Sequence, residues 1–432
     1  MGKDIKKQLM KAEQLDKAMQ YKRAAKLFNT VGNEFLKLGD IERAKDCFFN
    51  AAKCAINEDK YVSGLEFLRS AGNASLITND FSEAFQFYTK ALSYVPSLHS
   101  SSDRDYQFIL FSCLSYLCLF IEGKQEEGLN LVKKIKSFVD DTYFKENSLI
   151  KLIKDLTVAT KDKKENYLKK IENDFENFKF QEGESYLTKL ALVLAKSILN
   201  LKTESMFDKN VYTTNDIINF NINIDTKPLL DISKNSFYNY QIKELQISKI
   251  TITLSDNFTT HKKPEFPITI KAGQNYQLNL LFKPHFQMEK PFIGPIILTS
   301  ELNGNLKFYY EIPETFYPNL ISPPPTLDIS IKNLRPPLIG QSFPLEILIE
   351  NKSEGDALDL NIEVEFPEKL KVMRGTLKKQ IYSLRSNENM KWEINIKPLE
   401  AGDYSFKVKT MFKDPDQNQI GEIKDFPLSI KL

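Results

Sequence analysis

The sequence predicts a multidomain α plus β protein, with a helical first half followed by two all-β units. Three observations support this fold class. Residues 21 to 96 contain an internal repeat with a period of 40 residues. Proline is rare before residue 228 and alanine is rare after residue 195, which suits helices first and strands and turns afterwards. From about residue 216, apolar and polar residues alternate as in a strand. We therefore predict three domains, at residues 1–204, 205–320 and 326–432.

The repeat has the pattern of a helical hairpin. Six positions recur with similar residues 40 positions apart: Gly32 and Gly72, Gly39 and Asn79, Ile41 and Phe81, Ala44 and Ala84, Phe48 and Tyr88, and Ala51 and Ala91. Each small residue is expected where two antiparallel helices cross closely, and each aromatic residue fills the space one turn further on. With Pro96 closing the second unit, these columns resemble the tetratricopeptide repeat. That resemblance implies an α-solenoid that binds peptides or other proteins.

Helical periodicity continues through the rest of the first half. Apolar spacing predicts a first helix over residues 3–20, and residues 21–31 echo the second-helix column of the repeat. Further periodic runs, which bring the expected number of helices to about ten, lie at about 142–160, 162–177 and 183–202. The longest apolar run, residues 106–121, is interrupted by two serines and is too short to span a bilayer.

Beyond residue 216, alternating segments predict half-buried strands of antiparallel sheets. In INFNINI, residues 218–224, the isoleucines and the phenylalanine face one side and the three asparagines face the other. The same alternation recurs at 250–254, 276–282, 343–349, 360–366, 390–396 and 404–408. The stretch NLISPPPTL predicts an extended linker between two β units. Two immunoglobulin-like sandwiches in tandem are the simplest interpretation, although Trp392 has no disulfide to pack on, so kinship with antibody domains is not expected.

Composition argues against several functional classes. The formal net charge is +2 with 27% charged residues, so no overall field draws the protein to nucleic acid or to an acidic membrane. The N-terminal MGKDIKKQLMKAEQ is charged where a signal peptide would need an apolar core. All four cysteines fall in the helical half, which favours a reducing cytosol. We expect a cytoplasmic protein that does not bind nucleic acid and reaches membranes only through partners.

Motifs for catalysis, cofactors or metals are missing from the sequence. His99, His261 and His285 are far apart, and there is no HExxH, CxxC, GxxxxGK[ST] or GxSxG motif. Cys113 and Cys118 are interpreted as small apolar residues of a buried helix. The sequence DPDQNQ lacks the glycine and glutamate spacing of a calcium loop and predicts a hairpin turn instead. We predict that the protein is not an enzyme and has no cofactor or metal site.

The helical half also contains a distinctive order of segments. CLSYLCLFIEGKQEEGLNLVKKI is followed by LIKLIKDL, by the charged KDKKENYLKKIENDFE and by the closing YLTKLALVLAKSIL. This order resembles the C-terminal half of the soluble attachment proteins that load the SNARE-disassembly ATPase. AAKLFNTVGNEFLKLGDIERAKDCFFNAAKCA is also similar to that family, so the resemblance covers about the first 200 residues. It implies an α-solenoid with a basic face that grips an acidic coiled-coil bundle.

The chain departs from the attachment-protein pattern in three respects. It has fewer predicted helices, it has no N-terminal apolar membrane loop, and its helical half continues into sandwiches. The family stimulates its ATPase through a short tail at that position, so ATPase stimulation does not carry over. A solenoid followed by such sandwiches is also similar to vesicle-tethering and coat subunits.

Two groups of lysines form the candidate partner-binding site. They lie at the end of one predicted helix and on the next but one: Lys133, Lys134, Lys136, Lys161, Lys163, Lys164, Lys169 and Lys170. If neighbouring helices place them on one side of a solenoid, they form the basic face that the resemblance implies. The alternative is a solvated surface of mixed charge, because four acidic residues lie among them: Glu126, Glu127, Glu165 and Glu172.

These observations lead to three functional hypotheses. The first is a non-catalytic adaptor, in membrane trafficking or complex assembly, whose solenoid binds an acidic or helical protein partner such as a SNARE-like bundle. The second is a structural subunit of a tether or coat complex whose sandwiches carry the interface. The third is an enzyme or ligand-binding protein of unfamiliar type, with a pocket between domains.

Overall fold

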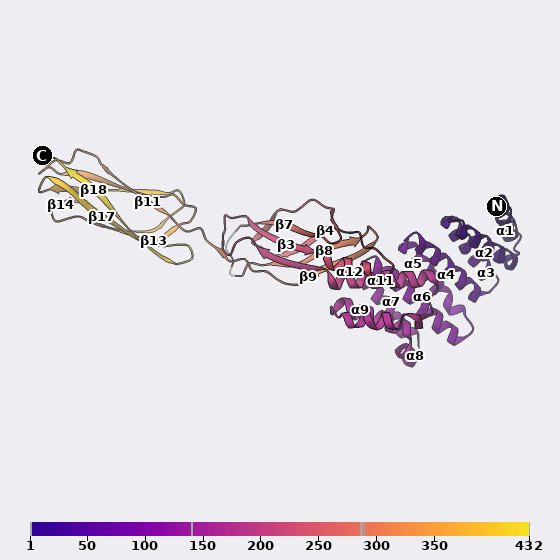
Figure 1. The fold of residues 1–432 in the computed structure, drawn as a ribbon. Helices are drawn as coiled ribbons and strands as arrows, with labels where there is room; N and C mark the ends of the chain where they lie inside the picture. Colours follow the sequence, from indigo (N-terminus) through magenta and orange to yellow (C-terminus); the bar gives the residue numbers. More distant parts are fainter. Residues whose placement is uncertain (1, 140, 286–287, 289, 432) are drawn as a thin grey trace.

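The computed structural model describes residues 2–139, 141–285, 288 and 290–431. Helices fill the first half and antiparallel sheets dominate the second, which confirms the predicted α plus β layout. The molecule is elongated, with the helices at the N-terminal end, a first pair of sheets in the middle and a second pair at the C-terminal end (Figure 1).

Eleven α-helices precede the first strand in the described part of the chain. They are α1 (Gly2–Lys17), α2 (Tyr21–Lys37), α3 (Ile41–Asn57), α4 (Tyr61–Ile77), α5 (Phe81–Tyr94), α6 (Ser101–Ile121), α7 (Gln125–Phe138), α8 (Asp141–Glu146), α9 (Ser148–Lys161), α10 (Glu165–Asn173) and α11 (Glu182–Asn200). From α1 to α7, each helix packs chiefly on its neighbours along the chain. Helix α11 departs from this order and packs on α4, α6 and α9 together.

Two predicted helices are broken in the structure. The run predicted at 142–160 is divided into α8 and α9, because the Asn147 side chain accepts a hydrogen bond from the Leu149 N–H at 2.9 Å and starts a new helix. The run predicted at 162–177 becomes α10 and a short 3₁₀ helix, Phe175–Phe178. Among the described residues, α6 alone has the length and composition of a membrane span, and 72% of its apolar window is buried inside the fold. It is therefore a core helix here.

A recurring turn sets the 20-residue spacing of the first helices. Its residue in left-handed conformation, with φ between 55° and 75°, is Met19, Gly39, Asp59 or Asn79. In each turn, the residue after the left-handed one donates its N–H to the carbonyl oxygen of the residue five positions before the donor, at 2.9 or 3.0 Å. An example is the bond from Asp40 to Phe35. This bond ends one helix in the way a Schellman motif does. After two of these turns, the Asp40 and Asp80 carboxylates cap the following helix.

The glycine and aromatic columns of the repeat meet as predicted. A Cβ atom added at Gly32 of α2 would lie 2.9 Å from the Phe48 ring of α3. A Cβ atom added at Gly72 of α4 would lie 2.4 Å from the Tyr88 ring of α5. Because both distances are shorter than an ordinary carbon contact, only glycine lets each helix pair approach this closely.

The first pair of sheets follows α11 directly. One sheet has the order β1-β3-β7-β5 and the other β6-β4-β8-β9. The strands are β1 (Lys202–Phe207), β3 (Ile218–Asp225), β4 (Glu244–Leu254), β5 (Phe258–Lys262), β6 (Ile268–Lys271), β7 (Asn275–Pro284), β8 (Ile293–Leu302) and β9 (Leu306–Ile312). INFNINI lies on β3, where its isoleucines and phenylalanine are buried, as predicted. The short helix α12 (Lys227–Lys234), which has Pro228 in its first turn and buries Leu229 and Ile232, was not predicted.

The helical region and the first pair of sheets share one hydrophobic core. A single cluster of buried side chains extends from Ala52 in α3 to Leu320 after β9. At the junction, the Phe175 and Phe237 rings pack edge to face at 5.1 Å, and the hydroxyl of Tyr238, which follows α12, donates to Glu172 of α10. These two regions are therefore packed as one body.

The second pair of sheets has a core of its own. Its sheets have the orders β11-β12-β16-β14 and β15-β13-β17-β18. The strands are β11 (Leu327–Asn333), β12 (Phe343–Asn351), β13 (Ala357–Glu365), β14 (Leu370–Arg374), β15 (Lys378–Leu384), β16 (Asn389–Pro398), β17 (Gly402–Lys413) and β18 (Gln419–Ile430). Their inward side chains form a separate cluster that includes Trp392.

The predicted linker joins the two sheet pairs. Within its first residues, β10 (Leu320–Ile321) pairs in parallel with β2 (Tyr212–Thr213), which ties the start of the linker to the first pair. The Ser322 N–H then donates to the Asp416 carboxylate at 3.0 Å. Asp416 belongs to DPDQNQ, whose turn is closed by the Asn418 N–H donating to Asp414 at 2.8 Å, as predicted for a hairpin.

Candidate partner-binding surfaces

All eight predicted site lysines are exposed, on two separate parts of the helical region. Lys133, Lys134 and Lys136 lie in the second half of α7, and the others lie at the end of α9, in the next turn and on α10. Lys161 and Lys163 line a hollow of about 290 Å³ together with Gln125 and Glu126 from the start of α7. Lys133 lies eight residues after Gln125 on α7, which is a distance of about 12 Å at a rise of 1.5 Å per residue. The two groups therefore lie near opposite ends of α7.

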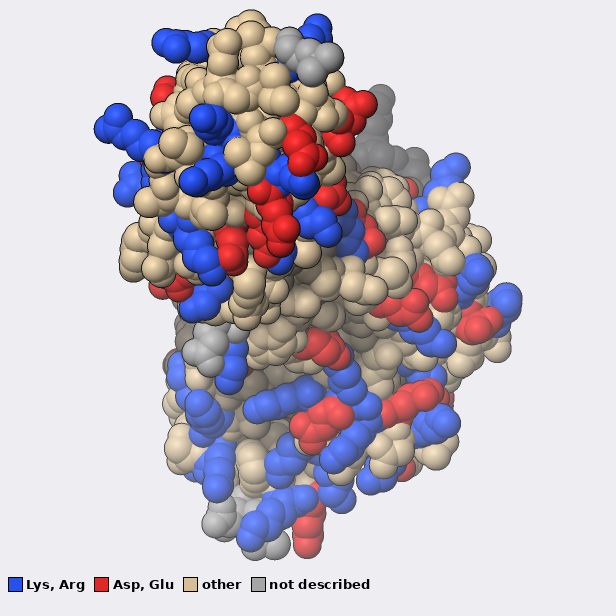
Figure 2. Space-filling model, turned by 90° about the vertical axis from the view of Figure 1, so that its left-hand side faces the viewer, with Lys and Arg blue, Asp and Glu red and all other residues tan. Residues whose placement is uncertain are grey.

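Several of these lysines already have local partners. Lys164 pairs with Asp162 at 3.5 Å, and the Lys163 ammonium lies 5.6 Å from the centre of the Tyr310 ring on β9. The Lys170 ammonium lies 4.5 Å from the Tyr167 ring. On the face shown in Figure 2, acidic side chains (red) lie among the basic ones (blue) in both the upper and the lower part of the view. The lysines thus form two local groups within a surface of mixed charge.

A groove of about 620 Å³ that lies between α2, α4 and the start of α11 was not predicted from the sequence. We call it the α2–α4–α11 groove. It is lined by apolar and uncharged polar side chains, with one carboxylate: Asn33, Leu36, Phe48, Ser70, Asn73, Ala74, Leu76, Ile77, Gln181, Glu182, Gly183 and Tyr186. Ile77 is 57% exposed although it is a large apolar side chain.

Hydrogen bonds fix the wall of this groove. The Asn73 amide of α4 donates to the Gln181 side chain at 2.7 Å and accepts from the Tyr88 hydroxyl at 2.7 Å. The Tyr186 hydroxyl donates to Asn79 at 2.9 Å. The bonds of Asn73 to Gln181 and of Tyr186 to Asn79 join residues more than 100 positions apart in the chain, so the groove exists only when α11 folds back onto α4.

A buried ion pair anchors α11 beside the groove. Arg69 of α4 donates two hydrogen bonds to Glu184 of α11, at 2.5 and 2.7 Å, and the Glu184 side chain is fully buried. Burial on its own would lower the pKa of Arg69, but the hydrogen bonds and the charge of Glu184 outweigh it and the pKa is raised. Because removing one member of a buried pair costs about 3 to 5 kcal/mol, this contact holds the two walls together.

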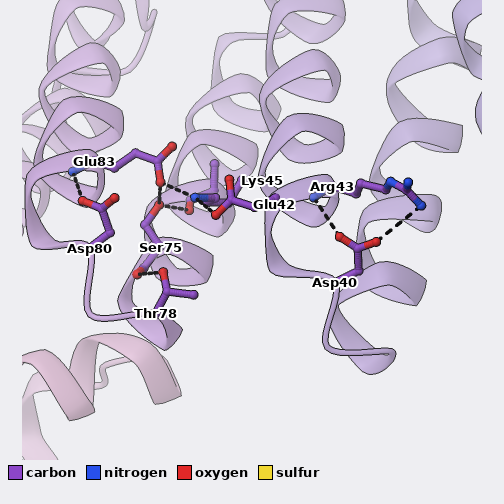
Figure 3. A network of polar contacts seen from close by, with 9 residues as sticks. Asp40, Glu42, Arg43, Lys45, Ser75, Thr78, Asp80 and Glu83 are labelled. Carbon is purple, nitrogen blue, oxygen red and sulfur yellow. Dashed lines mark hydrogen bonds and ion pairs between the residues drawn. The ribbon is translucent and has the colours of Figure 1, made fainter.

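A second polar network stiffens the helices next to the groove (Figure 3). Lys45 of α3, whose side chain is 5% exposed, pairs with Glu42 at 2.8 Å and with Glu83 of α5 at 2.5 Å. The Ser75 hydroxyl of α4 donates to the same Glu83 at 2.9 Å. Burial lowers the pKa of Lys45, but the two carboxylates outweigh it and the pKa is raised. Three consecutive helices are thus cross-linked by one charged cluster.

The described residues contain no group of three or more acidic, histidine or cysteine side chains that could hold a metal ion. The four cysteines are buried and unpaired, and burial raises the pKa of each thiol: Cys47, Cys54, Cys113 and Cys118. No histidine, cysteine or lysine occurs among the described residues that line the groove. The groove presents apolar surface and side-chain amides.

Comparison with known proteins adds no assignment. No protein-family model matches the chain, and no curated protein matches it.

Proposed function

We propose that this protein is a non-catalytic adaptor that works by protein–protein contact in membrane trafficking or in the assembly of a complex. The observation that carries the proposal is the α2–α4–α11 groove, where the exposed Ile77 side chain, further apolar side chains and amides line a hollow of about 620 Å³. Apolar anchors with a few well-placed hydrogen-bonding groups favour a segment of another protein as the occupant.

We also propose finer identities for the folded parts. The 20-residue spacing and the paired glycine and aromatic contacts support an α-solenoid of the tetratricopeptide and attachment-protein kind over residues 1–204. Two four-stranded sheets around one core in each β unit support immunoglobulin-like sandwiches at residues 205–320 and 326–432. The proposed location is the cytoplasm.

The proposed partner is a helical protein with acidic side chains, such as a SNARE-like bundle. Its apolar side chains would enter the groove, and its carboxylates would meet the lysine groups on α7 and on α9–α10. A partner that touches both groups has to extend for about 12 Å along α7. A helical bundle is long enough for this.

The groove is tested by one substitution with a matched control on the same helix. Ile77 and Val62 lie at opposite ends of α4 and are 57% and 56% exposed, but only Ile77 lines the groove. With the full chain as bait, Ile77→Asp should release the captured partner and Val62→Asp should retain it. Binding of the purified partner should weaken about 30-fold, as expected for a central contact worth about 2 kcal/mol. Equal binding by the two variants would contradict the groove as the site.

The lysine groups need a separate test with purified partner. Lys133 and Lys134 are reversed to glutamate in one variant, Lys163 and Lys164 in a second, and all four in a third. Exposed ion pairs contribute about 0.2 to 1 kcal/mol each, so the third variant should lose at least about fourfold in affinity, with a smaller effect at high salt. If the third variant binds as the parent does at low salt, these lysines are only solvated surface.

The alternative is a structural subunit whose sandwiches carry the interface. The hollow on the outer face of the second sheet pair, described below, favours it. Removal of residues 326–432 should then abolish assembly while capture through the groove survives.

A further inference from the structure

The two outer faces of the second sheet pair differ in how their charges are paired. On the β15-β13-β17-β18 sheet, the register places Glu363 opposite both Lys378 and Lys409. Lys378 pairs with Glu363 at 2.8 Å, and Lys409 pairs with Glu365. Opposite charges across neighbouring strands stabilise a sheet, so this face is neutralised internally.

The other sheet, β11-β12-β16-β14, has the reverse arrangement. Its register places Lys371 of β14 directly opposite Lys397 of β16, and Glu346 of β12 directly opposite Glu393 of β16. All four side chains are exposed or half-buried on the outer face. Among the described residues, none of the four forms an ion pair. Like charges directly opposite each other destabilise a sheet, so a ligand that brings opposite charges would stabilise this face.

Two arginines meet at a hollow between these like-charge pairs. Arg335, just after β11, and Arg374, at the end of β14, both line a hollow of about 470 Å³ together with Ser342, Asn395 and one carboxylate, Glu393 of the glutamate pair. Neither guanidinium has a hydrogen bond or ion pair with another described residue. A guanidinium presents a planar fork of donors that matches a carboxylate, and two such forks face the same space here.

We propose that the outer face of the β11-β12-β16-β14 sheet docks an extended acidic segment of another protein. From the C-terminal end of β16 towards its N-terminal end, the lysine pair comes first, then Asn395 beside the arginines, and then the glutamate pair. Side chains two residues apart on a strand are about 6.6 Å apart, so the three rows span about 13 Å. An extended segment with charges at alternate positions, in the order acidic, acidic, basic, matches these rows. This docking surface goes beyond the proposed groove function and does not depend on it.

The surface is tested with the full chain and a labelled peptide whose central sequence is Glu-Ser-Glu-Ser-Lys, by fluorescence anisotropy. The parent should bind it and should not bind the charge-reversed Lys-Ser-Lys-Ser-Glu peptide. Arg335→Gln combined with Arg374→Gln should weaken binding at least tenfold. The matched control, Lys378→Gln combined with Lys409→Gln, removes two charges from the opposite face and should change binding less than twofold.

Three results would overturn the proposal. They are no binding by the parent, equal losses in the two double variants, and binding of a peptide with phosphoserines in place of the glutamates but not of the glutamate peptide. The last result would assign the arginines to a phosphorylated ligand instead. Ile77→Asp should leave peptide binding unchanged, so a failure of the groove is distinguishable from a failure of this surface.

Thermal unfolding supplies a second readout that needs no ligand. Glu346→Gln removes one of two facing carboxylates, so the melting temperature of the second sheet pair should rise while affinity for the peptide falls. Glu363→Gln breaks an ion pair on the other face and should lower the melting temperature without changing affinity. If Glu346→Gln lowers the melting temperature, the facing carboxylates are not strained and the proposal fails.

Discussion

The crossing of α4 and α5 at Gly72 gives a stability prediction whose sign is opposite to that expected from helix propensity. Gly72 lies inside α4, where alanine would favour the helix by about 0.8 to 1.0 kcal/mol. A Cβ atom there would lie 2.4, 2.8 and 3.0 Å from three atoms of the Tyr88 ring. The ring has no exposed surface, and its hydroxyl donates to Asn73 at 2.7 Å. It therefore has little room to move.

The expected cost follows from these contacts. Overpacking a filled core costs about 1 to 3 kcal/mol, and a displaced ring also loses a hydrogen bond worth about 0.5 to 1.5 kcal/mol. After the propensity gain is subtracted, Gly72→Ala should destabilise the fold by about 1 to 3 kcal/mol. Gly32→Ala should cost less, because its nearest contact with Phe48 is 2.9 Å.

The assay is chemical denaturation followed by far-ultraviolet circular dichroism, as a double-mutant cycle with Tyr88→Leu. Without the ring, alanine at Gly72 meets no close atom from Tyr88 and keeps its propensity advantage. Gly72→Ala should therefore stabilise the Tyr88→Leu background by about 0.5 to 1 kcal/mol while destabilising the parent. If Gly72→Ala stabilises both backgrounds equally, the two helices do not cross at this distance and the reasoning is refuted.

Three further predictions concern the helical region and its neighbours. Ala84→Leu, at a position with no exposed surface, should lower the melting temperature clearly, because the added atoms cost about 1 to 3 kcal/mol. Burial raises the pKa of Cys47 to about 12 from its ordinary 9.0, so the native thiol should react with a disulfide reagent about a thousandfold more slowly than a free thiol at pH 8. By the same shift, the contribution of Cys47 to stability is complete below pH 9 and is lost as the pH rises towards 12, which alkaline melting curves would reveal. Fragment 1–321 should melt cooperatively, whereas fragment 1–204 should expose part of the shared core and bind a hydrophobic dye; equal dye binding by the two fragments would contradict the shared core.

Local features of the fold were predictable because they depend on residues close together in the chain. Gly32 and Phe48 are 16 residues apart on neighbouring helices, so a 40-residue repeat of their types was enough to place them in contact. The alternation of INFNINI likewise determines which side chains of β3 are buried. Helix α12 was missed because it is short and lies within a region that otherwise alternates.

The candidate surfaces depend on contacts between distant parts of the chain, which composition and spacing do not reveal. The groove needs Gln181 beside Asn73, and that contact follows from how α11 crosses the array. The lysines were predictable as exposed positions, but their separation depends on the antiparallel course of α7 and α9. The facing charges on β12, β14 and β16 become visible only when the register of each strand pair is known.

The linker connects the proposed surfaces in a defined geometry. The groove lies at the far end of the helical region, in the body that shares its core with the first sheet pair, and the arginine hollow lies on the second sheet pair. A Cβ atom at Gly355 would lie 1.7 Å from the Pro323 carbonyl oxygen, so the second pair packs directly on the linker backbone. Asp416 binds Ser322, and Asn215 of the first body donates to Glu354 of the second pair. Consecutive prolines keep the intervening backbone extended. Two partners bound at these surfaces would therefore be held apart at opposite ends of one elongated molecule, which is the geometry an adaptor needs.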